Sequence, residues 1–384
     1  MSGHLKVGVT TFGGDGGKSG ISQYIINLLN EFSKMENAAQ FEVMVYENEK
    51  DIFVPRENGL KSLCFSEKIQ NPIRNVAWHQ SRLPHICKRQ KYDVMFLPAG
   101  NRRLPMSSPC PTVGTVHDFS SIHVKAKYDP ARMFYITRVL PFLIRRLTRI
   151  LTVSESSKRD IVEYARVPEE FVTVTPLAAD PKIYFPRDQE ESFHRVANKF
   201  SVTQPYMLFI SRIEHPGKNH AKLIEAFNLL KAREHLPHQL VLAGSDWNGA
   251  AEVHRLAEAS PFKNDIMFTG FVRTEDLPDL FCGSELFVFP SLYEGFGLPV
   301  LEAMSCKVPV ACSNLSSMPE VAGDAGLLFD PYEVEHLTET LKMILTNDAL
   351  RQDLAERGYQ RSRCFTWEAT AQKTMQVIQN ACAR

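Results

Sequence analysis

Short apolar runs alternate with helix-like segments along the whole chain, and this alternation restricts the fold more than any other feature. In the first half the pattern predicts strands at 6–11, 41–46, 93–97, 112–116, 150–153 and 172–175. A second series begins at Tyr206, with strands expected at 207–211, 240–243, 266–269, 286–289, 308–312 and 326–329. Strands that alternate with helices indicate parallel sheets with crossover helices. The chain is therefore expected to be α/β, with two Rossmann-like halves.

A linker is expected between the two series. Residues 178–205 are charged, contain proline and show no clear period. We therefore predict a first domain over 1–182, a linker over 183–204 and a second domain over 205–364.

Composition agrees with a two-domain soluble protein. The chain has 384 residues, of which 44% are hydrophobic and 23% charged. No run approaches the roughly 20 apolar residues that span a bilayer, and residues 1–11 enter a strand without a signal-peptide core. The cysteines include no C-x-x-C pair and no zinc spacing. We expect a reduced, cytoplasmic protein without a structural metal.

Charge is divided unevenly along the chain, although the net charge is zero. Residues 1–200 hold 28 Lys and Arg against 21 Asp and Glu, whereas residues 201–384 hold 16 against 23. The excess is concentrated in residues 60–149, with 16 basic and 4 acidic residues. The first half is therefore expected to face an anionic partner.

Two glutamates, Glu294 and Glu302, enclose a loop with two glycines and a proline. The run 286–289 predicts a buried strand before the loop, and Pro299 is suited to open a helix after it. Such a loop lies at the carboxyl end of a strand, where open α/β sheets bind ligands and where helix N–H groups attract anions. The two carboxylates beside this loop can accept hydrogen bonds from the hydroxyl groups of a ligand. This layout predicts a site for a phosphorylated sugar.

The stretch 289–304, FPSLYEGFGLPVLEAM, resembles the E-x7-E element of retaining nucleotide-sugar glycosyltransferases, most closely family 4, also called group 1. The resemblance covers nearly the whole chain and is sharpest over 206–331. It implies the GT-B fold, in which the parallel sheets of two Rossmann-like domains face a central cleft. It also implies that the last helix, within 365–384, crosses back to the first domain.

The resemblance assigns roles around this element. In the family, the glutamate that matches Glu302 accepts hydrogen bonds from the ribose hydroxyls of the donor. The glutamate that matches Glu294 faces the sugar of the donor. Backbone N–H groups of Phe296, Gly297 and Leu298 are expected to complete the contact with sugar and phosphate. Retaining members of this fold are usually described as front-face reactions, and the sequence does not separate that mechanism from a double displacement.

A second loop, after the expected strand 207–211, carries Arg212, Lys218 and Asn219. Arg212 and Lys218 can neutralise a diphosphate together. The forked guanidinium of Arg212 can form paired hydrogen bonds, and the ammonium of Lys218 acts as a point charge. Negative charge grows there as the sugar bond breaks, so these groups would stabilise the transition state more than the ground state. The family has an arginine and a K-N pair at matching positions, which implies this role. The alternative is a surface loop with ordinary charges.

His117 and Asp118 follow the expected strand 112–116. Family members that resemble mannosyltransferases often carry such a pair, which implies that His117 contacts the transferred sugar and that Asp118 orients it. Without the resemblance, a lone histidine is more often structural.

The glycine-rich loop 13–20 does not match a P-loop, which would need glycine in place of Phe12. In the family, a glycine loop after the first strand approaches the donor phosphate and the acceptor. Gly14 and Gly17 are the expected contacts.

No D-x-D sequence occurs in the chain. Glycosyltransferases of the other large fold hold a divalent metal on the diphosphate with that motif. Here Arg212, Lys218 and a helix dipole can take its place, so we expect no metal and no other cofactor.

Basic and aromatic residues interleave in two helix-like stretches of the first half. The first comprises Arg74, Trp78, His79, Arg82, His85, Lys88 and Arg89, and the second Arg132, Phe134, Tyr135, Arg138, Phe142, Arg145, Arg146 and Arg149. Pro141 is expected to end or kink the second helix. These stretches fit an anionic membrane surface, or ordinary amphipathic helices whose aromatic residues face the core. Nucleic acid is not expected, because the surplus belongs to half of an enzyme-like cleft.

The resemblance therefore implies a retaining hexosyltransferase for surface glycans such as lipopolysaccharide. The expected donor is GDP-mannose, with UDP-sugars as the second choice, and the expected acceptor is a saccharide linked to a lipid diphosphate. The expected location is the cytoplasmic face of the plasma membrane. A GT-B sugar epimerase or phosphorylase would share this fold, and so would a non-catalytic sugar-nucleotide binding protein. No pyridoxal lysine site supports a phosphorylase, and the intact charged residues of both loops argue against a silent protein.

Overall fold

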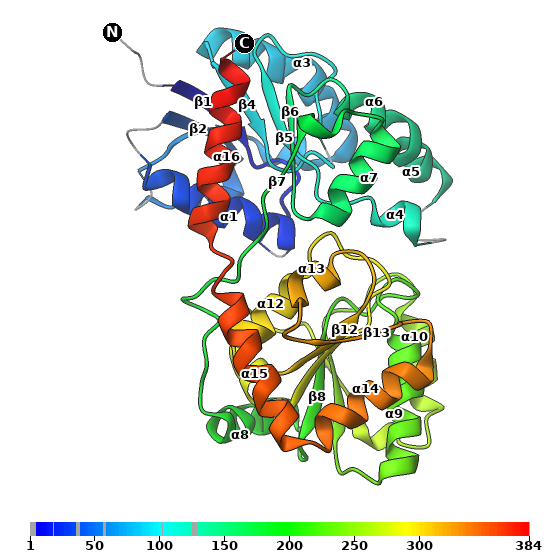
Figure 1. The fold of residues 1–384 in the computed structure, drawn as a ribbon. Coiled ribbons are helices and arrows are strands. Elements are labelled where there is room, and N and C mark those ends of the chain that lie inside the picture. The colour runs from blue at the N-terminus through cyan, green and yellow to red at the C-terminus, as the bar shows by residue number, and fades with distance from the viewer. Residues whose placement is uncertain are drawn as a thin grey trace. The chain divides into compact units, whose positions relative to one another are not determined.

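The computed structural model describes residues 5–17, 19–35, 39–56, 59–101, 103–124 and 129–383. It divides the chain into two compact units. Unit 1 comprises Met1–Ile122, Tyr128–Leu177 and Thr366–Arg384, and unit 2 comprises Ala178–Phe365 with His123–Lys127. Each unit is an α/β domain on a parallel sheet, as the sequence predicts (Figure 1).

Unit 1 contains a seven-stranded parallel sheet of order β3-β2-β1-β4-β5-β6-β7. Its strands are β1 (Leu5–Thr10), β2 (Ala39–Tyr46), β3 (Lys61–Phe65), β4 (Val94–Leu97), β5 (Thr112–Thr115), β6 (Arg149–Thr152) and β7 (Val172–Val174). Its α-helices are α1 (Gly20–Ser33), α2 (Lys50–Phe53), α3 (Pro72–Gln90), α4 (Ser120–His123), α5 (Pro130–Phe134), α6 (Leu140–Ile144), α7 (Glu155–Ala165) and α16 (Trp367–Cys382). Shorter turns are η1 (Glu47–Glu49), η3 (Glu67–Gln70), the π-helical η4 (Tyr135–Val139) and η5 (Glu169–Phe171).

Helices cover both faces of this sheet. On one face, Phe32 of α1 stacks on Phe41 of β2 with ring centroids 4.6 Å apart. Met44 lies three residues further along β2 and so points to the other face, where it shares a core with Trp78 and Leu83 of α3. Helix α16 packs against α1 and beside β4, β5 and β6. The last helix is thus part of unit 1.

Pro141 is the position at which the helix of the second basic stretch is expected to end or kink. The helix does not end there, because α5 continues through η4 into α6, and the N–H of Leu140 donates to the carbonyl of Tyr135. A proline inside a helix removes one N–H donor and crowds the preceding turn. The widened π turn just before Pro141 is a usual way to absorb such a disturbance.

Unit 2 contains a six-stranded parallel sheet of order β10-β9-β8-β11-β12-β13. Its strands are β8 (Tyr206–Ile210), β9 (Gln239–Ala243), β10 (Ile266–Gly270), β11 (Leu286–Phe289), β12 (Val310–Ser313) and β13 (Leu327–Phe329). Its helices are α8 (Gln189–Phe200), α9 (His220–Glu234), α10 (Ala250–Glu258), α11 (Leu277–Cys282), α12 (Leu298–Ser305), α13 (Met318–Ala322), α14 (Val334–Leu345), α15 (Asp348–Ser362) and the 3₁₀ turn η6 (Lys263–Asp265).

The expected linker over 183–204 is wrong. These residues belong to unit 2, and most of them form α8, which packs against α11. Asp188 begins the helix by accepting the N–H of Glu191 at 2.9 Å. Only Ser192 and Val196 of α8 are buried, and the helix as a whole is polar, so it offers few apolar positions to a sequence pattern. Among the residues that the structure describes, no helix combines the length and the apolar character needed to cross a bilayer.

Candidate active site

The site begins with two neighbouring strands of unit 2. Strands β8 and β11 pair in parallel, with Leu286 opposite Met207, so the loops that follow them leave the sheet at the same edge. The N–H of Leu292, in the loop after β11, donates to the carbonyl of Gly217, in the loop after β8, at 3.0 Å. The sequence predicted ligand-binding residues on both loops. The sheet order brings these loops together.

Lys218 and Glu294 are in direct contact across the two loops. The Lys218 Nζ atom lies 2.5 Å from Oε1 of Glu294, and the side chains are 17% and 18% exposed. The ammonium also lies 5.8 Å from the ring centroid of Phe289. The residue expected at the diphosphate and the residue expected at the sugar therefore share one small volume. Their partial exposure leaves both accessible to a ligand.

Two serines hold the loop that carries Glu294. The N–H of Glu294 donates to Oγ of Ser316 at 3.0 Å. The hydroxyl of Ser317 donates to the carbonyls of Glu294 and Phe296 at 3.0 and 2.8 Å. The loop backbone is thus fixed from behind, while the carboxylate of Glu294 faces Lys218.

Helix α12 begins at this loop with unused donors. Gly297 precedes the helix with φ of +106°, a conformation that favours glycine. A Cβ atom there would lie 2.3 Å from Cε of Met318. In the described part of the chain, the N–H groups of Phe296, Gly297 and Leu298 donate to no other protein atom. Three free donors and the positive end of the helix dipole form an anion-binding arrangement.

Glu302 is the fifth residue of α12, just after its first turn, because the helix begins at Leu298, one residue before Pro299. It keeps some solvent exposure, yet desolvation raises the pKa of its carboxyl to about 7. A hydrogen bond from Tyr184 acts in the opposite direction. Tyr184 lies in the segment that we expected to be a linker, and sequence reasoning missed it. The periodicity of the sequence gave no sign of this long-range contact.

Arg212 and Asn219 have protein partners of their own. The guanidinium of Arg212 lies 4.9 Å from the ring centroid of Trp247 and 3.9 Å from Glu214, and its side chain is 52% exposed. Asn219 adopts a left-handed conformation before α9, and its Nδ2 atom donates to the carbonyl of Pro331 at 2.8 Å. Arg212 is thus exposed beside an aromatic ring, whereas the amide of Asn219 is used within the protein.

A buried histidine supports the loop after β8. The ring of His220 contacts the carbonyl of Glu214 through Nδ1 at 3.2 Å and the hydroxyl of Ser211 through Nε2 at 3.4 Å. Burial lowers the pKa of His220 to about 3, so the ring is neutral at physiological pH. Sequence reasoning missed this residue as well.

In unit 1, His117 follows β5 and is 7% exposed. Its Nε2 atom lies 2.8 Å from the carbonyl of Pro98, and its ring meets the edge of Tyr24 at a centroid distance of 4.9 Å. The carboxylate of Asp118, which was expected to orient this ring, accepts the N–H of Ser120 at 2.9 Å, at the start of α4. Short acidic side chains readily cap the following turn, and that local bond decides where Asp118 points.

The two expected glycines of unit 1 lie in the turn after β1. The N–H of Gly14 donates to the carbonyl of Thr11 at 3.0 Å, and an added Cβ would lie 2.7 Å from Phe53. Gly17 has φ of +88°, and its carbonyl accepts from Nε2 of Gln23 at 2.8 Å. Both glycines are therefore required by the shape of the turn. Lys18, beside them, lies outside the described residues.

Groups of three or more His, Cys, Asp or Glu side chains with the geometry to hold a metal ion are absent from the described parts of both units.

Comparison with known proteins gives matches in both halves of the chain. Residues 190–361 match the family model described as Glycosyl transferases group 1, and residues 18–183 match Glycosyltransferase Family 4. The O-antigen chain mannosyltransferase B of Escherichia coli is 36% identical over 265 residues, which are 68% of this chain and 68% of that protein. The serotype-specific mannosyltransferase WbdA of Escherichia coli is 32% identical over 360 residues. That match covers 90% of this chain but 43% of the longer relative.

Solved structures show the same fold. Sucrose-phosphate synthase from Thermosynechococcus elongatus superposes with a TM-score of 0.77 at 18% identity, covering 99% of both chains. At this identity the likeness concerns the fold alone. It confirms the GT-B fold that the sequence resemblance implied.

Proposed function

Since the chain belongs to the group 1 and family 4 glycosyltransferases, we propose that it transfers a hexosyl group from a nucleotide-diphosphate sugar to a saccharide acceptor. Mannose is the proposed sugar and GDP-mannose the proposed donor. The contact between Lys218 and Glu294 is the observation that carries this proposal. The mannosyltransferases named above support the choice of mannose and of a surface glycan as product.

The donor would bind at the joined loops of unit 2. Its diphosphate would form an ion pair with Lys218 in place of Glu294. It would also accept hydrogen bonds from the free N–H groups at the start of α12. The freed carboxylate of Glu294 would then accept from hydroxyls of the sugar. Arg212 would add a second cation, and Glu302 would accept from the ribose hydroxyls. The cationic side chains and the N–H groups at the diphosphate would stabilise the transition state more than the ground state, because negative charge grows on the leaving phosphate.

Retention of configuration and independence of metal ions are parts of the same proposal. With the cationic groups already beside the diphosphate site, no divalent ion is needed to stabilise the leaving group. Turnover should therefore survive EDTA. Loss of turnover in EDTA from a protein that stays folded would contradict this assignment. Analysis of the anomeric configuration of the product by NMR tests retention.

Roles for His117 and for the glycine turn of unit 1 are further parts of the proposal. We assign His117 to contact with the transferred sugar. Gly14 and Gly17 are assigned to backbone contact with the donor phosphate and the acceptor. The acceptor would be a saccharide linked to a lipid diphosphate. The protein would then work on the cytoplasmic face of the plasma membrane, held by the basic residues of the first half.

Incubation of the purified protein with GDP-mannose, with UDP-glucose as the second donor, tests the proposal. Slow release of GDP from GDP-mannose is expected even without acceptor. Glu294→Ala should abolish this release while the protein stays folded, whereas Glu252→Ala, at a partly exposed glutamate of α10 that pairs with Arg255, should leave it unchanged. Tight binding of donor without any release by the wild type would instead favour a non-catalytic binding protein. Release from UDP-glucose alone would reassign the donor.

A further inference from the structure

Trp247 lies in the loop that follows β9, and its side chain is 51% exposed. The other two tryptophans of the chain, Trp78 and Trp367, are both 6% exposed. The guanidinium of Arg212, in the loop after β8, lies 4.9 Å from the centroid of the Trp247 ring. Arg212 is one of the two cations that we assign to the diphosphate. A half-exposed aromatic ring is therefore in contact with a cation of the candidate site.

Backbone hydrogen bonds hold these two loops together beyond the ends of β8 and β9. The N–H of Ile213 donates to the carbonyl of Ser245, and the N–H of Trp247 donates to the carbonyl of Ile213, both at 2.9 Å. The N–H of His215 donates to the carbonyl of Asn248 at 3.0 Å. The place of the tryptophan opposite the loop after β8 is therefore set by the backbone.

Two glycines allow the loops to approach so closely. Gly244 and Gly249 stand on either side of the segment, with φ of +148° and +78°. A Cβ atom at Gly244 would lie 1.8 Å from the carbonyl oxygen of Ser211. One at Gly249 would lie 2.9 Å from the carbonyl oxygen of His215. Since both obstacles are backbone atoms, only glycine fits at these positions. The loop that carries Trp247 is thus shaped to lie on the loop that carries Arg212.

An aromatic ring can hold a cation without neutralising it. The face of the ring attracts the charge of a guanidinium, whereas a carboxylate also accepts its N–H groups. Lys218 is held in the second way, 2.5 Å from Glu294, so a phosphate has to replace that carboxylate. The carboxylate of Glu214 lies 3.9 Å from Arg212, which is longer than a hydrogen bond. Within the described part of the chain, the guanidinium of Arg212 donates to no hydrogen-bond acceptor.

We propose that Trp247 is a positioning residue for donor binding, whose ring holds the guanidinium of Arg212 at the diphosphate and leaves its N–H groups to the phosphate oxygens. The two cations of the site then differ in how they are held before the donor arrives. Lys218 exchanges one anion for another, and Arg212 binds without giving up a partner. The inference rests on the proposed function and adds to it a residue outside both site loops.

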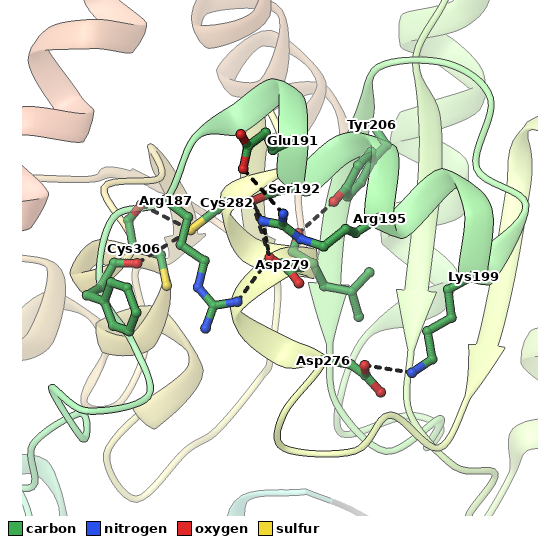
Figure 2. A network of polar contacts seen from close by, with 12 residues as sticks. Arg187, Glu191, Ser192, Arg195, Lys199, Tyr206, Asp276, Asp279, Cys282 and Cys306 are labelled. Carbon is green, nitrogen blue, oxygen red and sulfur yellow. Dashed lines mark hydrogen bonds and ion pairs between the residues drawn. The ribbon is translucent and has the colours of Figure 1, made fainter.

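A second arginine and aromatic ring of unit 2 provide the contrast (Figure 2). The guanidinium of Arg187 lies 5.0 Å from the ring centroid of Phe185, which is 43% exposed. Arg187 also donates to Asp279 of α11 at 3.0 Å. A carboxylate of the protein already neutralises this cation. Phe185→Leu is therefore the matched control for Trp247→Leu.

Calorimetric titration of GDP into the wild type, Trp247→Leu, Arg212→Met and the double variant tests the inference. Trp247→Leu should weaken GDP binding roughly threefold to tenfold, and Arg212→Met about tenfold or more. In the Arg212→Met background, Trp247→Leu should change the affinity by less than about twofold, because the ring acts through the arginine. Trp247→Phe, which keeps a ring, should recover most of the affinity. Phe185→Leu should stay within about twofold of the wild type.

Quenching of tryptophan fluorescence tests the contact without any nucleotide. Iodide is an anion that the charge of Arg212 attracts to the exposed ring of Trp247, whereas acrylamide is neutral. The ratio of iodide quenching to acrylamide quenching should therefore fall by about 1.5-fold or more in Arg212→Met. Lys222→Met, which removes an exposed cation of α9, should leave the ratio unchanged.

An unchanged quenching ratio in Arg212→Met would overturn the inference, since the ring and the cation would then be apart in solution. Equal losses of affinity from Trp247→Leu with and without Arg212 would also overturn it, and would assign the ring to direct contact with the nucleotide. A loss in Phe185→Leu as large as in Trp247→Leu would overturn it as a general loosening of unit 2. These outcomes leave the proposed function intact. Failure of the wild type to bind GDP, UDP or GDP-mannose would instead overturn the proposed function.

Discussion

At the scale of single residues, Lys218 and Glu294 are the most informative pair. Because the two side chains contact each other at 2.5 Å, their roles should be coupled. Lys218→Met and Glu294→Gln are each expected to lower kcat/KM for GDP-mannose by roughly 10²–10³-fold, the range found when a donor to developing charge is lost. The double variant should lose far less than the product of the two. Steady-state kinetics on the three variants measures this.

Lys222→Met with Glu225→Gln is the matched control, since this exposed pair of α9 is also an ion pair, with a 3.0 Å separation. Its loss should leave kcat/KM within about twofold, in line with the small value of surface pairs. Fully multiplicative effects at Lys218 and Glu294 would mean that their contact in the free protein does not couple their contributions.

Glu302 gives a prediction about stability with a defined sign. Its folded pKa of about 7 lies above the ordinary value of 4.5, so its contribution to stability is complete below 4.5 and is lost as pH rises through 7. Glu302→Gln should therefore raise the free energy of unfolding at pH 8, by roughly 1–2 kcal/mol after allowing for partial exposure, and barely change it at pH 4.5. Urea unfolding at the two pH values measures this. Equal effects at both would contradict the assigned pKa.

The sequence named several site residues and missed others for a physical reason. Glu294, Glu302, Arg212 and Lys218 stand on loops or helix starts beside strands, so a local pattern predicts where each one lies. Tyr184 comes near Glu302 only because of the course that residues 178–200 take in the folded protein, and no local pattern encodes that proximity. Asp118 shows the reverse case, since its carboxylate accepts the N–H of Ser120, only two residues further along the chain.

At the scale of elements, the start of α12 depends on Gly297. Alanine there meets two obstacles, a left-handed backbone and the side chain of Met318 at 2.3 Å. Gly270 has a similar backbone, φ of +68°, with open space around its missing Cβ. Gly270→Ala is expected to cost about 1 kcal/mol of unfolding free energy and Gly297→Ala about 2–4 kcal/mol. Equal losses in thermal or chemical unfolding would mean that the contact with Met318 relaxes freely.

The docking of α8 on α11 depends on one carboxylate. Although burial acts in the other direction, bonds from Arg195 and Arg187 lower the pKa of Asp279. Asp279→Asn is expected to reduce the free energy of unfolding by about 1–2 kcal/mol, because two arginines lose their shared negative charge although one acceptor oxygen remains. Asp276→Asn, which breaks the Lys199–Asp276 pair of 2.6 Å, should cost about 0.5 kcal/mol or less. Chemical denaturation compares the two, and a larger loss for Asp276→Asn would contradict this view of the network in Figure 2.

Most strands were predictable because their central positions in parallel sheets are uniformly apolar, as in β11, where all four residues are buried. Strand β3 was missed because it is an edge strand with partly exposed residues at Lys61–Phe65. Helix α8 was missed because its burial is small and its ties to α11 are polar. In both cases tertiary pairing, and not local hydrophobicity, decides the structure.

At the scale of the whole molecule, the uneven charge is the remaining feature to explain. Trp78 and His79 of α3 are core residues, since they are 6% and 1% exposed. That stretch therefore fits an ordinary amphipathic helix. The second stretch differs, because Phe134 and Phe142 are 64% and 39% exposed beside the exposed arginines Arg138 and Arg146. The proposed membrane contact is thus assigned to α5, η4 and α6.

Each basic residue near an anionic bilayer contributes about 1 kcal/mol, so Arg138→Glu with Arg146→Glu should weaken binding to phosphatidylglycerol vesicles at least about tenfold. Lys222→Glu with Lys263→Glu changes the net charge of the protein equally, but on α9 and η6 of unit 2, and should keep most of the binding. Sedimentation with vesicles at low salt measures all three proteins, and added salt should weaken the wild type. If the two double variants lose binding equally, net charge alone governs the attraction. If the wild type does not sediment at all, the basic residues of unit 1 serve another partner.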